Sequence, residues 1–140
     1  MLRNYARRRE SQSHPILTES IVLPVEDWKL QLTRFALDVG EGMMFLRQNN
    51  ICHPGICSRK VLLSRYGTCK LYDFVPEESA QNTLIGFLEQ KCPPLAWLPP
   101  EAIFLRRYSW QADVWAFAVV LWEIFSFGKA GLGIRSITMK

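Results

Sequence analysis

The chain has 140 residues, which is enough for one domain or for part of one. Hydrophobic residues make up 49% of it and charged residues 21%, and this composition excludes an intrinsically disordered protein. The net charge of +4 is modest and comes largely from arginines within residues 3–9, where a solvated helix face is favoured over a patch for nucleic acid or acidic lipid. We therefore expect no nucleic-acid partner.

The cysteines and the apolar runs bear on the cellular compartment. Cysteines stand at positions 52, 57, 69 and 92 without a pair at zinc-site spacing, so a zinc site that combines Cys52, His53 and Cys57 is disfavoured. With no disulfide framework and no signal peptide in view, reduced thiols in the cytoplasm are expected. The longest apolar run, residues 114–125, contains Glu123 and is too short to cross a bilayer. The sequence thus predicts a cytoplasmic chain without a membrane segment.

The first part of the chain is predicted to be largely helical. Residues 2–10 have the pattern of a short helix, residues 11–24 are polar and indicate a loop, and residues 25–50 have the periodicity of one long helix. Gly40 and Gly42 weaken the long helix by about 1 kcal/mol each relative to alanine, which suggests that another backbone approaches closely there. The apolar stripe of this helix consists of Trp28, Leu32, Phe35, Ala36, Val39, Met43 and Leu46.

The second part combines a small hairpin with another long helix. Residues 61–64 and 69–72 are predicted strands joined by a turn that contains Gly67, and residues 76–94 are predicted to be irregular. Ser109 is the expected N-cap of a helix over residues 110–127. Because this helix is apolar nearly all round, it is expected to be buried within a larger body. Four tryptophans are accordingly expected in the core: Trp97, Trp110, Trp115 and Trp122.

Several stretches resemble motifs of the protein-tyrosine kinase family, in the family's order. Residues 36–46 resemble A-x-x-V-A-x-G-M-x-Y-L, and residues 53–63, H-P-G-I-C-S-R-K-V-L-L, resemble the catalytic loop H-R-D-L-A-A-R-N followed by apolar residues. Asp73-Phe74-Val75 stands where the family has D-F-G. Residues 94–103 resemble P-[VIL]-[KR]-W-M-A-P-E-[SA]-[IL]. Residues 109–128 resemble T-x-x-S-D-V-W-S-F-G-V-x-L-W-E-I-F-x-x-G and give the most specific match.

The resemblance implies a mainly α-helical fold, namely part of the large lobe of a protein kinase, whose parent fold is α+β. The small β-hairpin would lie beside the catalytic-loop position. Residues 1–128 would form this partial domain, from the hinge-proximal helix to the central buried helix, and residues 129–140 would be a divergent tail. The pattern is that of the receptor type, so the chain is expected to be cytoplasmic, either alone or as the intracellular part of a membrane receptor.

The positions that carry the chemistry of the family are changed in this chain. Gly55 stands at the position of the catalytic aspartate, so we assign no catalytic residue and expect no phosphotransfer. Lys60 replaces a metal-binding asparagine and is interpreted either as a point charge for phosphates or as a solvated surface lysine. Asp73 keeps the position of a magnesium ligand, or remains only as an acceptor of backbone hydrogen bonds. Val75 replaces a flexible glycine.

The resemblance implies structural roles at other motif positions. In the family, His53 and Asp113 would brace the backbone of the catalytic loop, and Glu101 would be exposed here because its usual arginine partner lies in a later helix. Pro54 replaces an arginine that pairs with a phosphorylated residue, and no tyrosine lies between residues 74 and 100, so both halves of that switch are missing. The structural positions are His53, Arg59, Phe74, Trp97, Glu101, Asp113 and Trp115.

These changes favour a pseudokinase-type module that binds, scaffolds or allosterically controls a protein partner such as a related kinase. No cofactor is expected for this chain, and ATP and Mg²⁺ would be used only if a longer parent is active. A weak ATP-dependent tyrosine kinase in a longer parent is the first alternative. A truncated product without independent function is the second. The sequence leaves the oligomeric state open.

Overall fold

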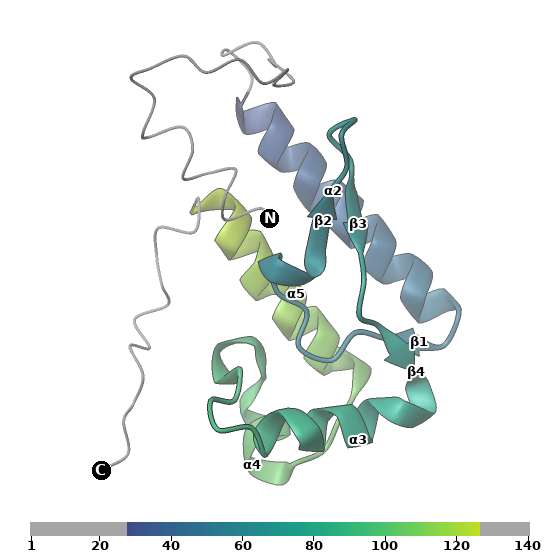
Figure 1. The fold of residues 1–140 in the computed structure, drawn as a ribbon, viewed down its shortest axis with the longest axis vertical. Helices are drawn as coiled ribbons and strands as arrows, with labels where there is room; N and C mark the ends of the chain where they lie inside the picture. The colour runs from purple at the N-terminus through teal and green to yellow at the C-terminus, as the bar shows by residue number, and fades with distance from the viewer. Residues whose placement is uncertain (1–27, 127–140) are drawn as a thin grey trace.

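The computed structural model describes residues 28–126 of the chain. The short helix and the loop predicted before residue 25, the tail predicted after residue 128, and the predicted ends of the two long helices beyond this range lie outside the described residues. Within the range, the fold is mainly helical with two small antiparallel sheets (Figure 1). The predicted mainly α-helical class with a small hairpin is therefore confirmed.

Helix α2, Trp28–Gln48, is the longest element and follows the predicted helix closely. Most of its predicted apolar stripe faces the interior, where Leu32, Phe35 and Val39 are buried. The predicted stripe is wrong at Trp28, which lies at the start of the helix and is exposed. The helix ends in a turn at Asn50, whose φ of 54° lies in the left-handed region that asparagine tolerates better than most residues. This turn reverses the chain and leads it back across the end of α2.

The predicted hairpin is present. Strands β2, Val61–Leu63, and β3, Cys69–Leu71, pair antiparallel, and each is one residue shorter than predicted. Gly67 has a φ of 83°, which supplies the left-handed residue that the turn requires. Asp38 Oδ2 on α2 accepts a hydrogen bond from the backbone N–H of Cys69 at 2.7 Å, so the hairpin is attached to the helix.

A second strand pair is followed directly by a helix that the sequence did not predict. Strand β1, Ile51–Cys52, pairs antiparallel with β4, Val75–Pro76, and helix α3, Glu77–Leu88, begins at the next residue. The prediction that residues 76–94 are irregular is therefore wrong over α3. Ala80 and Leu84, one helical turn apart, are both fully buried and account for the helix. Gly86 and the neighbouring prolines obscure this short periodicity in the sequence.

The chain then forms two more helices, α4 and α5. Helix α4, Pro100–Leu105, begins with a proline, which is well suited to the first helical position. Helix α5, Trp110–Phe125, confirms the predicted last helix over the described residues. Ser109 occupies the expected N-cap position in an extended conformation, but its side chain makes no capping hydrogen bond. No helix within residues 28–126 has the length and hydropathy needed to cross a membrane.

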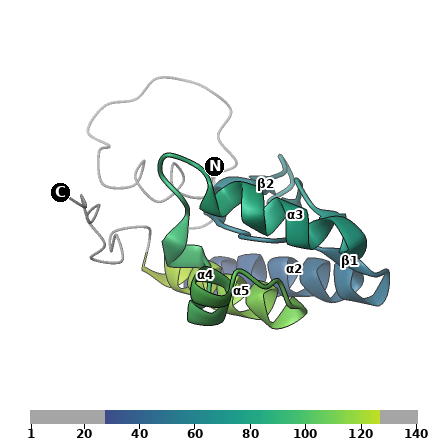
Figure 2. The same cartoon turned by 90° about the horizontal axis from the view of Figure 1, so that it is seen from below.

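Helices α2 and α5 lie side by side, and the hairpin and α3 lie over one face of this pair (Figure 2). The main core lies between these two layers. A second cluster of Leu84, Leu98 and Ala102 joins α3 to α4. The buried residues of the main core are Leu32, Phe35, Val39, Ile56, Val61, Ala116, Val120 and Ile124.

Helix α5 buries only one of its faces. Along the outer face Trp110, Trp115 and Trp122 are 44%, 46% and 37% exposed. The prediction that these tryptophans belong to the core is therefore wrong for the described part of the chain, and Trp97 is half-buried. The physical reason is that α2 and the loops cover the opposite side of α5, while the described elements leave the tryptophans only partly covered.

The two glycines of α2 contact side chains rather than backbone. A Cβ added at Gly40 would lie 3.4 Å from Cζ of Phe117, and a Cβ added at Gly42 would lie 3.0 Å from Cδ1 of Leu71. The predicted close approach of another backbone is therefore wrong. Helix α5 and strand β3 approach α2 through a phenylalanine ring and a leucine side chain.

Candidate functional site

The loop between β1 and β2 carries several of the predicted site residues. After β1 the backbone N–H of Ile56 donates to the carbonyl oxygen of His53 at 3.2 Å, which closes a tight turn. Pro54 and Gly55 occupy its central positions, and Gly55 has a φ of 64°, in the left-handed region that glycine favours. A 3-10 turn, Ser58–Lys60, then leads into β2. Position 55 is thus part of a buried backbone turn.

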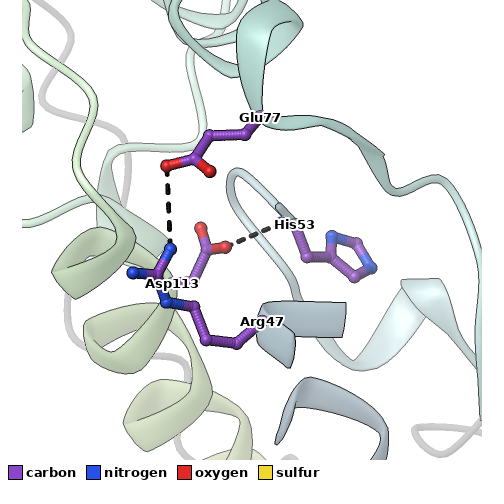
Figure 3. Close-up of polar contacts among 4 residues, drawn as sticks. All are labelled: Arg47, His53, Glu77 and Asp113. Carbon is purple, nitrogen blue, oxygen red and sulfur yellow. Dashed lines mark hydrogen bonds and ion pairs between the residues drawn. The ribbon is translucent and has the colours of Figure 1, made fainter. Parts of the chain in front are cut away.

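Two buried carboxylates of α5 hold this loop. Asp113 Oδ2 accepts a hydrogen bond from the backbone N–H of His53 at 2.7 Å (Figure 3). Glu123 Oε2 accepts one from the backbone N–H of Ser58 at 2.9 Å and another from the indole N–H of Trp97 at 3.2 Å. Hydrogen bonds to charged groups contribute about 1.5–3 kcal/mol each. Glu123 was not among the predicted residues, although an acidic residue inside an otherwise apolar helix was the available signal.

The second oxygen of Asp113 faces a different environment. Asp113 Oδ1 is buried without a hydrogen bond to any residue that the structure describes. The residue after His53 is Pro54, which has no backbone N–H, so the turn offers the carboxylate one donor fewer than another residue there would. Burial raises the pKa of Asp113, and the hydrogen bond from His53 and the nearby Tyr108 hydroxyl partly offset this effect.

A group of three side chains beside Asp113 joins three helix ends. Arg47, at the end of α2, has its Nη1 atom 3.6 Å from Oε1 of Glu77, at the start of α3 (Figure 3). The Arg47 guanidinium also lies 5.3 Å from the ring centroid of Trp110, at the start of α5. Both members of the ion pair are about half exposed, so the pair contributes at most about 1 kcal/mol. Sequence reasoning missed this group because its members are far apart along the chain.

The side chain of His53 packs in the interior of the protein. It is fully buried, and neither ring nitrogen makes a hydrogen bond within the described residues. Burial lowers the pKa of His53 to about 4, and the positive charge of Lys60 acts in the same direction. The ring is therefore neutral at pH 7.

Phe87 of α3 covers Gly55. A Cβ added at Gly55 would lie 3.4 Å from Cε2 of Phe87 and 4.0 Å from Cδ2 of Leu98. An aspartate at this position would have to adopt the left-handed φ of the glycine and also direct its carboxylate past the phenylalanine ring. Position 55 therefore lacks a carboxylate, and its left-handed backbone conformation disfavours a residue that would supply one.

Lys60 and Asp73 form an ion pair. Lys60 Nζ lies 2.8 Å from Oδ2 of Asp73, and the Lys60 side chain is 16% exposed while that of Asp73 is 57% exposed. The same ammonium lies 4.8 Å from the ring centroid of Phe87. The interpretation of Lys60 as a solvated surface lysine is therefore wrong, because the hairpin and α3 enclose its side chain and direct it to Asp73.

The residues present do not fit a bound magnesium ion. Mg²⁺ requires oxygen ligands in near-octahedral geometry, and the resemblance implies that two of them would come from positions 73 and 60. Position 60 supplies an ammonium that is directed at Asp73 itself. Over residues 28–126, no group of three or more His, Cys, Asp or Glu side chains is arranged to hold a metal ion.

The remaining predicted residues lie around this loop or on the surface. Arg59 is exposed, with its guanidinium 6.0 Å from the ring centroid of Trp97. Phe74 and Trp115 are each 46% exposed. Glu101 is exposed in the first turn of α4, as expected. The structure thus brings Gly55 and Lys60 to one phenylalanine ring and leaves several other motif positions at the surface.

Comparison with known proteins places these features in a family. The family model described as protein tyrosine and serine/threonine kinase matches residues 11–136. Tyrosine-protein kinase Fer of Mus musculus is 38% identical over 98 residues, which are 70% of this chain and 12% of that protein. Megakaryocyte-associated tyrosine-protein kinase of Rattus norvegicus is 39% identical over 100 residues, which are 71% of this chain and 21% of that protein.

A receptor is also among the similar proteins. Fibroblast growth factor receptor 2 of Dugesia japonica is 32% identical over 133 residues, which are 91% of this chain and 14% of that protein. The chain therefore spans only between 12% and 21% of the length of these three relatives.

Proposed function

The chain belongs to the protein tyrosine and serine/threonine kinase family, and on this premise we propose that it is a pseudokinase-type module. Such a module binds, scaffolds or allosterically controls a protein partner and does not transfer phosphate. The observation that carries the proposal is the state of position 55, where the family has its catalytic carboxylate. Gly55 lies there in a buried turn, and the Phe87 ring is packed against it.

The carboxylates near the loop are engaged elsewhere. Asp113 and Glu123 accept hydrogen bonds from backbone N–H groups of the loop, and Asp73 is paired with Lys60. None of these three is placed to accept the proton of a substrate hydroxyl, which is the task of the missing aspartate. Loss of a general base costs about 10²- to 10⁴-fold in rate.

The segment after Asp73 supports the same proposal. Val75 replaces the flexible glycine of the family motif and pairs with Cys52 in the β1–β4 sheet. Helix α3 then occupies the place of the activation segment, and its Phe87 contacts the loop. No tyrosine is available in this segment for phosphorylation. The segment is therefore expected to stay folded against the loop rather than to move aside for a substrate.

A phosphotransfer assay with radiolabelled ATP and a tyrosine-containing polymer tests the absence of activity. We expect no transfer above background from the 140-residue chain or from any longer chain that contains it. The matched control is the Asp73→Ala variant of the same chain. Transfer that appears with the unchanged protein and disappears in Asp73→Ala would show an active kinase and refute the proposal.

The retained Asp73 favours one alternative, a weak ATP-dependent tyrosine kinase in a longer parent. Thermal unfolding with ATP, measured with and without Mg²⁺, separates the two functions. A magnesium-dependent rise of the melting temperature supports the kinase. For the 140-residue chain we expect the same melting temperature in all conditions.

We propose that the partner is a protein, with a related kinase domain as the first candidate. We also propose that the chain acts in the cytoplasm, either alone or as the intracellular part of a receptor. Receptors and the tyrosine-protein kinase Fer are both among the relatives. Adding the chain to a purified active tyrosine-kinase domain should change the kcat/KM of that domain. An unchanged kcat/KM at a large excess of the chain would argue against a kinase partner.

A further inference from the structure

The ammonium of Lys60 has surroundings that a surface lysine lacks. The nitrogen atom itself is shielded from solvent, although its carboxylate partner Asp73 is 57% exposed. The Phe87 ring lies on another side of the ammonium, at 4.8 Å from Nζ to the ring centroid, a distance at which an aromatic face attracts a cation. Lys60 is therefore held in place by contacts from two separate segments of the chain.

The backbone aligns positions 60 and 73 with each other. The carbonyl oxygen of Lys60 accepts a hydrogen bond from the backbone N–H of Tyr72 at 3.3 Å, and the Tyr72 hydroxyl donates to the carbonyl oxygen of Arg59 at 2.9 Å. Asp73 follows with a φ of 68°, a left-handed conformation that is costly for a residue with a Cβ. The costly conformation places the Asp73 carboxylate against the ammonium.

We propose that the Lys60 ammonium is a resident cation that replaces the divalent metal at Asp73, so that this site is neutralised without Mg²⁺ and excludes it. The inference rests on the proposed function for the identity of Asp73 as the former metal position. It adds that one substitution has two effects at this site. The oxygen ligand of the asparagine is lost, and the lysine supplies the positive charge that the metal ion would have supplied.

The geometry opposes a metal ion at the carboxylate oxygen that contacts this lysine. A magnesium ion bound to Asp73 Oδ2 would lie 2.0–2.1 Å from that oxygen, while the ammonium already lies 2.8 Å from it. Two cations would then share one carboxylate oxygen and repel each other at short range. The metal would also lose the neutral oxygen ligand that an asparagine supplies at position 60.

Mn²⁺ is the probe that tests this proposal, because it broadens the NMR signals of nearby backbone amides. In the unchanged 140-residue chain, we expect no selective broadening of the amides of residues 72–74. The Lys60→Asn variant restores a neutral oxygen ligand and should bind Mn²⁺ at these residues about tenfold more tightly or better. Lys60→Arg keeps the positive charge and should show no gain. Adding Asp73→Asn to Lys60→Asn should abolish the gain.

Two results would overturn the proposal that Lys60 is a resident cation. One is broadening at residues 72–74 in the unchanged chain that is as strong as in Lys60→Asn. The other is a folded Lys60→Asn variant, judged by its circular dichroism, that gains no Mn²⁺ binding. If Lys60→Asn does not fold, the melting temperature of the unchanged chain in millimolar Mg²⁺ decides: we expect no rise, and a rise that Asp73→Asn removes refutes the proposal.

The outcomes also separate this inference from the proposed function. Mn²⁺ binding at Asp73 of the unchanged chain without any phosphotransfer refutes only the resident cation. Phosphotransfer that proceeds without a divalent metal refutes only the proposed function. Phosphotransfer that requires a metal at Asp73 refutes both.

Discussion

His53 of the loop and Asp113 of α5 show how single residues hold this loop in place. The backbone N–H of His53 donates to Asp113, and the imidazole ring is fully buried without a hydrogen bond to the described residues. Glu123 adds a second attachment at Ser58. Between these two attachments lie the Pro54-Gly55 turn and the ring of Phe87 packed over it. The loop is thus rigidly supported at positions that need no reactivity.

The burial of His53 predicts a pH-dependent stability. The pKa of His53 is about 4 in the folded chain, whereas the ordinary value of 6.5 applies to the unfolded chain. Between these two pH values the unfolded chain therefore binds more protons than the folded chain. Stability is therefore fully present above pH 6.5 and falls as the pH is lowered through this window. We expect the free energy of unfolding to drop by about 3 kcal/mol more between pH 7 and pH 4 in the unchanged chain than in His53→Phe. Urea denaturation at both pH values measures the difference.

The comparison with His53→Phe cancels the contributions of other titrating groups to the pH dependence of stability. Burial raises the pKa of Asp113, which is the opposite case: its contribution is present at low pH and is lost as the pH rises through the folded pKa. This contribution remains in both proteins and cancels. An equal pH dependence in the unchanged chain and in His53→Phe would contradict the assignment.

At the scale of elements, α2 is the support to which the hairpin and α5 are attached. It buries an apolar stripe against α5 and holds β3 through Asp38. Gly40 and Gly42 lie in the middle of this helix, where glycine costs about 1 kcal/mol relative to alanine. The two glycines differ in what surrounds them, so they make a matched pair for measuring how closely the neighbouring elements pack.

We expect Gly40→Ala to stabilise the chain by up to about 1 kcal/mol, since the new methyl group would meet Phe117 at an ordinary contact distance of 3.4 Å. In Gly42→Ala the methyl group would lie 3.0 Å from Leu71, so the gain in helix propensity should be reduced or reversed. Urea denaturation of both variants gives the comparison. A larger gain at Gly42 than at Gly40 would show that β3 packs more loosely than the structure indicates.

At the scale of the whole molecule, the outer face of α5 is the largest departure from a self-contained fold. Trp110, Trp115 and Trp122 are exposed there, together with Phe125 at 51%. A cavity of about 330 Å³ opens beside this face, between α2 and α5, with Met43 among its lining residues. Large exposed apolar patches favour association. This face is therefore the surface through which we expect the chain to associate.

We expect the 140-residue chain to associate as its concentration rises, because the exposed face of α5 gains by leaving water. Substitution of Trp115 and Trp122 by glutamine should reduce the association. The control is Tyr66→Gln, which removes an exposed aromatic side chain from the hairpin turn, away from α5. Light scattering after size exclusion measures the mass. A monomer at every concentration, unfolding cooperatively, would contradict this prediction and also the truncated-product alternative.

The family, the two long helices and the hairpin can all be predicted from the sequence alone. The helices and strands follow from the spacing of apolar residues within 10–20 neighbouring positions, which sequence patterns record directly. The motif around Asp113 and Trp115 and the changed residues Gly55 and Lys60 are likewise visible without coordinates. These features are the basis of the hypothesis that glycine stands at the position of the family's catalytic carboxylate.

The surroundings of positions 55 and 60 depend on contacts between residues that are distant in the sequence. Helix α3 forms because Leu84 can bury against Leu98 and Ala102, and that partner surface is separated from it in sequence. The same helix brings Phe87 onto Gly55 and beside Lys60, and the ion pair of Lys60 with Asp73 depends on strands that align residues 13 positions apart. The hydrophobicity of the α5 tryptophans predicts that they lie in the core, because it indicates a tendency to be buried. Burial itself requires a partner surface, which the sequence pattern does not reveal.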